Sequence, residues 1–402
     1  MSEVAQVPQL RFPEFSGEWE DGKLGNYGNL INGLTYSPDN IVDDGLLVLR
    51  SSNVQNGQIY LNDNVYVNLD VDDAALTKED DILICVRNGS KRLIGKSTII
   101  NKNLPKSTHG AFMTVFRGES NKFISHWFHS SIYYKEVHKN LGATINSING
   151  SNLKKFKTIF PAKSEQQKIA SFLTAVDTKI EQLSKKQALL GEYKKGLMQQ
   201  IFTQEIRFKA GDGSDFPDWE EKKLGDVFEI KAGQSKSKHI KKDGKNIIVD
   251  MGGISSEPKL VAKKLTDYDD DFLTTNDLVM PKDDIGGGLI IGKVAEIPEN
   301  NKYICGDHIY KLTVVNGNIT FLKYAINSYQ VNKSFRQKAN GTAQIGLSRK
   351  EVENQLLSFP SLKEQTKIAN FLSSIDSKIE QVGKQLNESK QFKKALLQQM
   401  FV

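Results

Sequence analysis

Apolar residues recur with a seven-residue spacing along two stretches of the chain, residues 163–202 and 362–401. In each stretch they fill two lines of positions that correspond to a and d of a heptad, with polar interruptions such as Gln187 and Lys194. The positions expected to pair helices are Ile169, Leu173, Val176, Ile180, Leu183, Leu190 and Leu197 in the first stretch and Ile368, Leu372, Ile375, Ile379, Val382, Leu386 and Leu396 in the second.

Each stretch is predicted to form one long helix that begins near Ser164 or Ser361. Both serines lie soon after a proline and three residues before a Gln or Glu, which is the spacing of a capping box. About forty residues give a rod of about 60 Å. Because an isolated helix would leave its apolar stripe in water, we expect the helices to form one antiparallel coiled coil with a globular part at each end. The alternative is that each helix pairs with a helix of another chain.

The chain is a tandem repeat, which is most evident at the start of the predicted helices. Residues 160–182 (FPAKSEQQKIASFLTAVDTKIEQ) and 359–381 (FPSLKEQTKIANFLSSIDSKIEQ) are identical at 14 of 23 positions without a gap. Weaker anchors lie upstream, LTKEDDIL at residues 76–83 against LTTNDLV at 273–279. We therefore expect two half-copies that share a fold and differ in surface.

Outside the helices, short apolar runs separated by Gly, Asn, Asp and Pro predict many short strands, followed late in each copy by helical stretches. The predicted fold class is α+β, with two pseudo-two-fold-related globular domains separated by the long helices. The predicted boundaries are 1–160 for the first domain, 161–203 for the first helix, 204–359 for the second domain and 360–402 for the second helix.

A second repeated segment opens each copy. Residues 10–26 resemble residues 206–226, with Trp19 corresponding to Trp219. The later segment follows the first helix, so the earlier one can occupy the equivalent place after the second helix. The chain is then nearly circular in topology, and we expect its two ends to lie close together.

Composition narrows the class of protein. The 402 residues suffice for two or three domains, and 38% hydrophobic and 25% charged residues are typical of a soluble protein. No apolar run is long enough for a membrane span, no export signal is readable and only Cys85 and Cys305 occur, so we expect a cytoplasmic protein without disulfides or structural zinc. The net charge of +6 permits a polyanionic partner without requiring one.

Catalytic motifs are not evident. Residues 287–293 have the glycine spacing of a phosphate-binding loop, but Val294 occupies the position where Ser or Thr would bind magnesium. Residues 89–97 have the serine but one residue too many between the glycines. Both segments precede β-rich runs, so we expect hairpin turns. The six histidines show no metal-ligand spacing, and we expect no catalytic residue, metal or cofactor in this chain.

Basic and polar residues gather in loops of both halves. Residues 231–245 contain six lysines, and residues 86–92 read VRNGSKR. Such side chains contact phosphates and base edges in the major groove, although a solvated surface is the alternative. With the Gly-rich stretches before each helix, the candidate DNA-contacting residues are Arg87, Asn88, Ser90, Lys91, Arg92, Thr144 and Asn146 in the first half and Lys231, Gln234, Lys236, Lys238, Lys241, Lys242, Thr342 and Gln344 in the second.

The repeated helix starts and the openings WEDGKLG (19–25) and WEEKKLG (219–225) resemble the DNA-specificity (S) subunit of Type I restriction-modification systems, over the whole chain. This resemblance implies a non-catalytic subunit with two target-recognition domains. Each domain would read one half of an asymmetric, bipartite DNA sequence, and the helices would set the number of unread base pairs between the halves.

The resemblance also implies partners and their cofactors. Two methyltransferase (M) subunits would use S-adenosylmethionine to methylate adenine, and two restriction (R) subunits, where the system has them, would use ATP and magnesium for cleavage. The outward helix faces, which include Lys168, Lys179, Lys185 and Lys186, are the expected seat of the M subunits, with a solvated exterior as the alternative. The competing function is a coiled-coil scaffold with two protein-binding domains and no nucleic acid.

Overall fold

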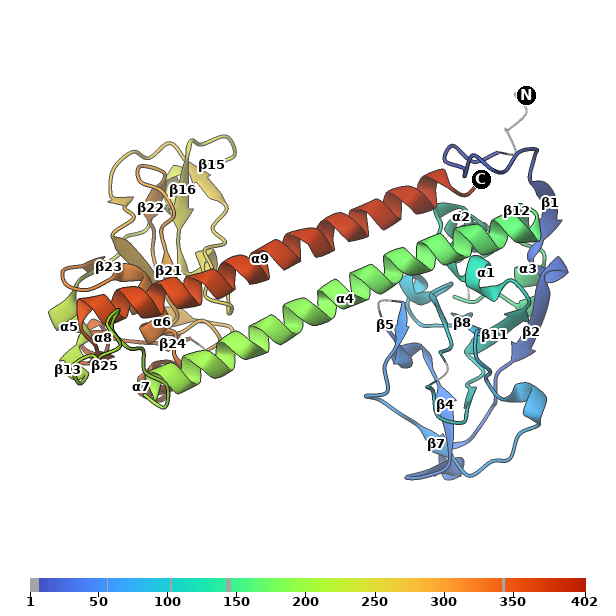
Figure 1. Ribbon diagram of the computed structural model, residues 1–402, viewed down its shortest axis with the longest axis horizontal. Helices are drawn as coiled ribbons and strands as arrows, with labels where there is room; N and C mark the ends of the chain where they lie inside the picture. The colour runs from blue at the N-terminus through green and yellow to red at the C-terminus, as the bar shows by residue number, and fades with distance from the viewer. Residues whose placement is uncertain (1–6, 56, 102, 142–145, 342–343) are drawn as a thin grey trace. The chain divides into compact units, whose positions relative to one another are not determined.

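The computed structural model describes residues 7–55, 57–101, 103–141, 146–341 and 344–402 (Figure 1). The chain divides into two compact units, unit 1 (Met1–Lys185 with Gly383–Val402) and unit 2 (Lys186–Val382). The predicted domain boundaries lie at the ends of the long helices, whereas the boundaries of the units lie inside them. Each unit therefore combines one globular domain with one end of each helix.

Unit 1 is built around a sheet of strand order β2-β11-β8-β9. A second sheet has the order β10-β4-β7-β3, and β1 pairs with β12. The strands are β1 Glu20–Lys23, β2 Gly28–Asn32, β3 Ile41–Val42, β4 Leu46–Leu49, β5 Val54–Gln55, β6 Gln58–Ile59, β7 Tyr66–Val67, β8 Ile82–Cys85, β9 Ser97–Ile99, β10 Ser107–His109, β11 Met113–Gly118 and β12 Lys157–Phe160. The short helices are α1 Asn121–Trp127, α2 Ser131–Asn140 and α3 Gly150–Lys154.

Unit 2 repeats this arrangement with a sheet of order β14-β23-β19-β21 and a second sheet of order β15-β17-β16-β22-β18. Its strands are β13 Glu220–Lys223, β14 Phe228–Ala232, β15 Ile240–Lys241, β16 Asn246–Val249, β17 Lys264–Thr266, β18 Phe272–Leu273, β19 Asp277–Pro281, β20 Asp283–Asp284, β21 Ala295–Glu296, β22 Tyr303–Cys305, β23 Ile309–Val314, β24 Ile345–Gly346 and β25 Leu356–Phe359. Its short helices are α5 Leu224–Val227, α6 Ile319–Ile326, α7 Tyr329–Lys338 and α8 Arg349–Glu353. The predicted α+β class and the repeat are confirmed.

The central sheet of each unit is buried on both faces. Along β8, Ile82 and Ile84 pack into the core that contains the helices, and Leu83 packs into a separate core beneath the second sheet. In unit 2, Leu278 and Val279 of β19 likewise enter different cores. Because successive side chains of a strand point to opposite faces, this burial accounts for the nearly continuous apolar runs in the sequence.

The long helices are α4 (Lys163–Phe202) and α9 (Leu362–Gln399). All the predicted pairing residues are buried or half-buried. The start predicted for the second helix is confirmed, because the Ser361 hydroxyl accepts a hydrogen bond from the Glu364 amide at 3.4 Å. The capping role predicted for Ser164 is wrong. Ser164 lies inside the first turn of α4, and Ala162 occupies the position equivalent to Ser361. Alanine has no side-chain acceptor, so the Glu165 amide donates to the backbone carbonyl of Ala162 instead.

Within each unit the two helix segments run antiparallel and are joined by an equivalent ion pair. In unit 1, Lys393 binds Asp177 at 2.5 Å, and in unit 2, Lys194 binds Asp376 at 2.6 Å. In each unit, a short helix of the globular domain also contacts the aspartate of this ion pair. His126 Nδ1 of α1 lies 3.7 Å from Asp177, and the Tyr324 hydroxyl of α6 donates to Asp376 at 2.6 Å.

The segment that opens each copy closes the contact between the helix ends. In unit 1, the Leu10 amide donates to the Gln399 carbonyl at 3.0 Å, which confirms the predicted proximity of the chain ends for the described residues. The next residue, Arg11, binds Glu165 at the start of α4. In unit 2, the Ile206 amide donates to the Gln200 carbonyl and Arg207 binds Glu364. The end of one helix therefore lies at the start of the other in both units.

Candidate nucleic-acid interface

Several loops leave the central sheet of unit 1 at one edge. Strands β2 and β8 both run antiparallel to β11, so they share a direction and end at the same edge, where β11 begins. We call residues 33–40, 86–93 and 110–112 the strand-end loops of unit 1. Loops at one edge of a rigid sheet are a common location for binding residues because the frame fixes their positions.

The structure brings two of the predicted basic and polar segments together in unit 1. The Ile148 amide donates to the Val86 carbonyl at 2.9 Å, and the Asn88 amide donates to the Asn146 carbonyl at 3.2 Å. The Asn146 side chain donates in turn to the Gly89 carbonyl at 2.9 Å. Residues 146–148 therefore support the loop that contains Arg87, although the two segments lie far apart in the sequence.

The side chains of this loop divide into structural and exposed groups. The Asn88 amide group donates to Ser51 and its carbonyl oxygen accepts from the Ser90 backbone, so this side chain shapes the loop. Arg87, Ser90, Lys91 and Arg92 are exposed. The Arg87 guanidinium lies 5.6 Å from the centre of the exposed Phe112 ring, and in the described part of the chain neither Lys91 nor Arg92 forms an ion pair. The loop thus presents cations that are free to bind an anion.

Unit 2 has equivalent strand-end loops, residues 233–239, 282–290 and 306–308. Strands β14 and β19 both run antiparallel to β23 and end where β23 begins. The equivalence extends to close contacts of the backbone. A Cβ on Gly33 would lie 2.1 Å from the Gly110 carbonyl oxygen, and one on Gly233 would lie 1.8 Å from that of Gly306, so only glycine fits at either position.

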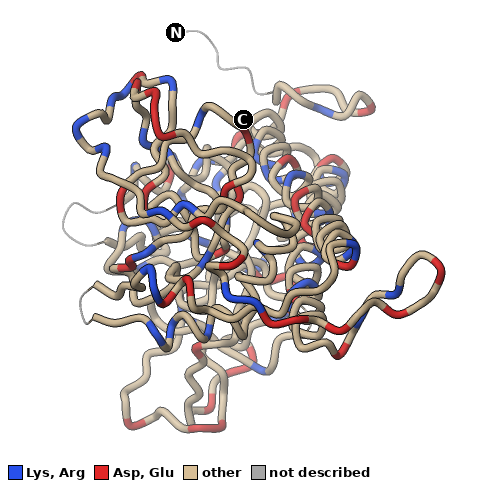
Figure 2. The backbone as a smooth tube through the Cα atoms, turned by 90° about the vertical axis from the view of Figure 1, so that its left-hand side faces the viewer, with Lys and Arg blue, Asp and Glu red and all other residues tan. Residues whose placement is uncertain are grey.

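The lysines of residues 231–245 have different environments. Lys231 binds Glu229 at 2.8 Å and Lys241 binds Asp267 at 2.5 Å, and these contacts raise the pKa of both lysines. Lys238 and Lys242, like Gln234, are exposed. Figure 2 shows Lys and Arg interspersed with Asp and Glu along the backbone.

Lys236 is a correction to the predicted set. Its side chain is only 7% exposed, its ammonium lies 3.4 Å from Asp271 and 4.7 Å from the centre of the Tyr268 ring, and it therefore has a structural role. Gln344 is exposed and adjoins β24. Thr144 and Thr342 lie outside the described residues.

One strand-end loop was missed by the sequence reasoning. Residues 283–290 (DDIGGGLI) occupy in unit 2 the place that the Arg87 loop occupies in unit 1, because the Leu347 amide donates to the Lys282 carbonyl as Ile148 donates to Val86. The anchors at residues 76–83 and 273–279 would have located this loop by alignment. The sequence predicted a hairpin turn for part of it, and it was not selected as a DNA contact because residues 283–290 contain no basic side chain.

The structure offers no catalytic constellation in the residues that it describes. Both thiols are buried, which raises the pKa of Cys85 and raises that of Cys305 to about 12. Within the described ranges, no cluster of His, Cys, Asp and Glu could hold a metal ion, and no helix has the length and apolar composition needed to cross a membrane. The glycine-rich segments connect the antiparallel pairs β8–β9 and β19–β21, so the predicted hairpin turns are confirmed.

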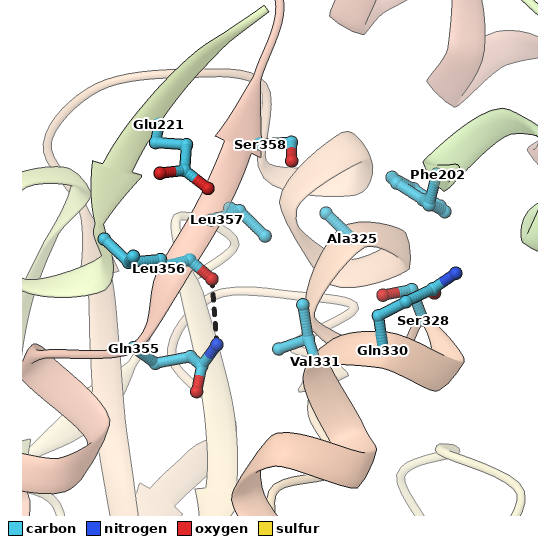
Figure 3. A pocket seen from close by; sticks show the side chains of 10 residues that line it. All are labelled: Phe202, Glu221, Ala325, Ser328, Gln330, Val331, Gln355, Leu356, Leu357 and Ser358. Carbon is cyan, nitrogen blue, oxygen red and sulfur yellow. Dashed lines mark hydrogen bonds between the residues drawn. The ribbon is translucent and has the colours of Figure 1, made fainter. Parts of the chain in front are cut away.

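A cavity of about 150 Å³ in unit 2 adjoins the end of α4 (Figure 3). Glu221 is the charged residue of its lining, which also includes Phe202, Gln355 and Leu357. The Gln355 side chain donates to the carbonyl of the adjacent Leu356 at 2.9 Å. A small hollow whose lining includes one acid does not have the convergent polar groups that are typical of an active site.

The outward faces of the helices carry both the predicted lysines and exposed aromatic residues. Lys168, Lys179, Lys185 and Lys186 are exposed. Tyr193 and Phe392 occupy equivalent positions in the repeat, and their side chains are 55% and 53% exposed. Aromatic side chains are enriched among the residues that anchor protein interfaces, so this equivalent pair is a candidate for contact with a partner.

Comparisons with known proteins agree with this architecture. The family model described as Type I restriction modification DNA specificity domain matches residues 16–190 and again residues 217–390. The chain is 24% identical over 404 residues to the Type I restriction enzyme StySPI specificity subunit of Salmonella potsdam. This alignment covers 92% of this chain and 85% of that protein. The chain is 25% identical over 409 residues to the EcoKI specificity subunit of Escherichia coli K12, with the same coverage.

Solved structures show the same fold. The crystal structure of the Type I restriction-modification S subunit from M. genitalium matches with a TM-score of 0.64 and 16% identity over 98% of this chain and 99% of that chain. A structure that describes complex assembly and conformational transition of the Type I system matches with a TM-score of 0.52. On the evidence of the doubled match to the family model, this chain belongs to the family of Type I restriction-modification DNA specificity subunits.

Proposed function

We propose that each unit reads one half of a bipartite DNA sequence with its strand-end loops, and that this chain is the non-catalytic specificity subunit of an adenine-methylating complex. The observation that carries this proposal is the doubled frame with unlike loops. At the strand ends of unit 1, one loop presents Arg87, Lys91 and Arg92. At the equivalent strand ends of unit 2, one loop belongs to the lysine-rich segment 231–245, and another, residues 283–290, contains acidic and aliphatic residues. A repeated frame with different contact residues suits two different half-sites.

The exposed cations supply affinity by neutralising phosphates. Lys238 and Lys242 in unit 2, like Lys91 and Arg92 in unit 1, are exposed on or next to strand-end loops. Arg87 beside Phe112 has the planar group that forms bidentate contacts with guanine in the major groove. Binding through such residues releases counterions, so its affinity falls steeply with salt, whereas a protein-binding scaffold would not bind duplex DNA in this way.

The long helices are proposed to set the distance between the half-sites and to hold the partners. At about 1.5 Å per residue, 40 and 38 residues correspond to helices of about 60 Å. We propose that two methyltransferase subunits dock on the outward helix faces, with Tyr193 and Phe392 as equivalent anchors. S-adenosylmethionine would belong to those subunits, and ATP and magnesium to restriction subunits where present, all in the cytoplasm.

The experiment is to express the full chain with its methyltransferase subunit in a host without adenine methylation and to map modified adenines across the genome. A split motif with a fixed gap is expected. The purified complex should also bind duplexes of that motif with an affinity that falls linearly on a log–log plot against salt. A continuous short motif, or no methylation from a correctly assembled complex, would overturn the proposal.

A further inference from the structure

The loop at residues 283–290 exposes two large aliphatic side chains. Ile285 is 68% exposed and Leu289 is 58% exposed, among the highest values for large apolar residues in the described part of the chain. Exposed apolar residues scattered singly are common, but here two lie on one short loop, and we call the part of the loop that carries them the apolar tip. Such a tip has a free-energy cost that a ligand could relieve.

The loop is held in this shape by its own acids. Asp284 is only 3% exposed, and its carboxylate accepts from the Gly286 amide at 2.5 Å and from the Ile290 amide at 2.8 Å. Gly287 and Gly288 have φ of +78° and +82°, which is the left-handed conformation that glycine adopts without strain. The tip is therefore presented by a built turn, which would lower the entropy cost of binding.

The base of the loop is fixed to the sheet. Residues of β20 pair with β24, with Asp284 opposite Ile345. The Asp283 carboxylate lies 2.6 Å from His308 Nδ1, at the entry to the central strand β23. Both acids of the loop therefore have partners within the protein, so neither carboxylate needs to face a bound polyanion.

The position of the tip indicates its ligand. It leaves the same sheet edge as the segment with Gln234 and Lys238, and it occupies in unit 2 the place of the Arg87 loop in unit 1. A loop that leaves the same sheet edge as the lysines proposed to bind phosphates, but exposes aliphatic side chains, suits an apolar feature of the DNA groove. The 5-methyl group of thymine is that feature in the major groove.

Building on the function proposed above, we propose that Ile285 and Leu289 contact thymine methyl groups, so that the half-site read by unit 2 contains A·T pairs selected by apolar contact. The half-site of unit 1 is instead read by the two arginines and the lysine of its equivalent loop. The two halves thus differ in chemistry as well as in sequence.

The test uses the full chain in complex with its methyltransferase subunits. The split motif is mapped first, and the half that belongs to unit 2 is identified by its change when residues 224–358 are exchanged. Each thymine in that half is then replaced by deoxyuridine, which removes only the methyl group. Affinity is measured at one salt concentration for the native complex, for an Ile285→Ser/Leu289→Ser variant and for a Val315→Ser control. Val315 is 70% exposed but follows β23 at the opposite end of the sheet.

For the native complex, deoxyuridine at a contacted position should lower affinity about fourfold, as expected for loss of one buried methyl group. The double variant should bind the thymine duplex more weakly and lose its response to deoxyuridine, while the Val315→Ser control keeps the native response. The inference is overturned if deoxyuridine has no effect at any thymine of the unit 2 half-site, if the double variant keeps the native response to deoxyuridine, or if the double variant fails only in binding the methyltransferase. Each of these outcomes leaves a split motif, and so the proposed function, intact.

Discussion

Removal of Arg11 should selectively loosen the contact that joins the two ends of the chain in unit 1. Its guanidinium donates to both carboxylate oxygens of Glu165, at 2.8 and 2.7 Å, and to the carbonyl oxygens of Gly17 and Ser16. The Arg11 side chain is 14% exposed and that of Glu165 is 2% exposed. In an Arg11→Ala variant, Glu165 keeps only a 3.4 Å contact with the Trp19 indole.

The magnitude follows from burial. Loss of one partner from a buried ion pair lowers the free energy of unfolding by about 3–5 kcal/mol, because the remaining charge stays desolvated. Since Arg11 is slightly exposed, we expect the lower end of this range, about 3 kcal/mol. The equivalent Arg207→Ala variant is the matched control. Arg207 is 25% exposed and contacts Glu364 at 3.0 and 3.4 Å. Glu364 is fully buried but keeps a 3.1 Å hydrogen bond from the Trp219 indole, so we expect a smaller loss of about 1–2 kcal/mol.

Hydrogen exchange with mass spectrometry measures this loss by region. In Arg11→Ala, amides at the start of α4 should exchange about 100-fold faster, since each factor of ten corresponds to about 1.4 kcal/mol. The segment that contains Arg207 follows α4 directly in the chain and stays tethered to it. The segment that contains Arg11 is held at the end of α9 by contacts such as the hydrogen bond from the Leu10 amide to the Gln399 carbonyl. Equal and small changes in both variants would refute the assigned role of this ion pair.

Further predictions concern the helices and pH. Tyr193→Ala and Phe392→Ala should each weaken methyltransferase binding about 10- to 30-fold in a pull-down titration, as for aromatic anchors. Deletion of residues 184–190 together with 383–389 should shorten the gap in the methylated motif by about three base pairs, as measured by methylation mapping, because seven residues span about 10 Å. Burial lowers the pKa of His126 to about 3, so the unfolded chain binds this proton more readily. The stability of unit 1 should therefore fall as pH drops from about 6.5 toward 3, which urea unfolding would detect.

Each of these predictions has a control and a contradicting result. Lys259→Ala, at an exposed residue outside the long helices, should leave methyltransferase binding nearly unchanged, and a loss equal to that of Tyr193→Ala would contradict the anchor role. A deletion that alters the half-sites themselves would contradict the proposal that the long helices set only the gap between them. His126→Tyr copies Tyr324 of unit 2 and should reduce the acid sensitivity of unit 1, and an unchanged pH profile would show that another group is responsible.

Features of the architecture that depend on periodic patterns were predictable from the sequence. The heptad positions, the repeat and the closure of the chain ends depend on spacings that the sequence contains directly, and residues such as Leu173 and Leu372 are fully buried as expected. The interface was less predictable. Lys236 belongs to a lysine-rich run, yet tertiary packing against Asp271 and Tyr268 directs it inward. Composition could not reveal those neighbours.

The contact residues of unit 2 illustrate the same limit. Residues 283–290 gained significance only when the strand ends of the two units were compared, because the role of a loop is set by the edge from which it leaves. Similarly, Asn88 was expected to contact DNA, but both ends of its side-chain amide already form hydrogen bonds within the protein. Charge in the sequence therefore pointed to a loop that the structure exposes at a strand end, but it could not show which side chains are already held within the protein.

An exchange of residues 224–358 for the corresponding segment of another specificity subunit, followed by genome-wide mapping of methylated adenines, tests the two-reader account most directly. We predict that one half of the motif changes while the other half and the gap are preserved. A change in both halves, or in neither, would contradict the assignment of one half-site to each unit.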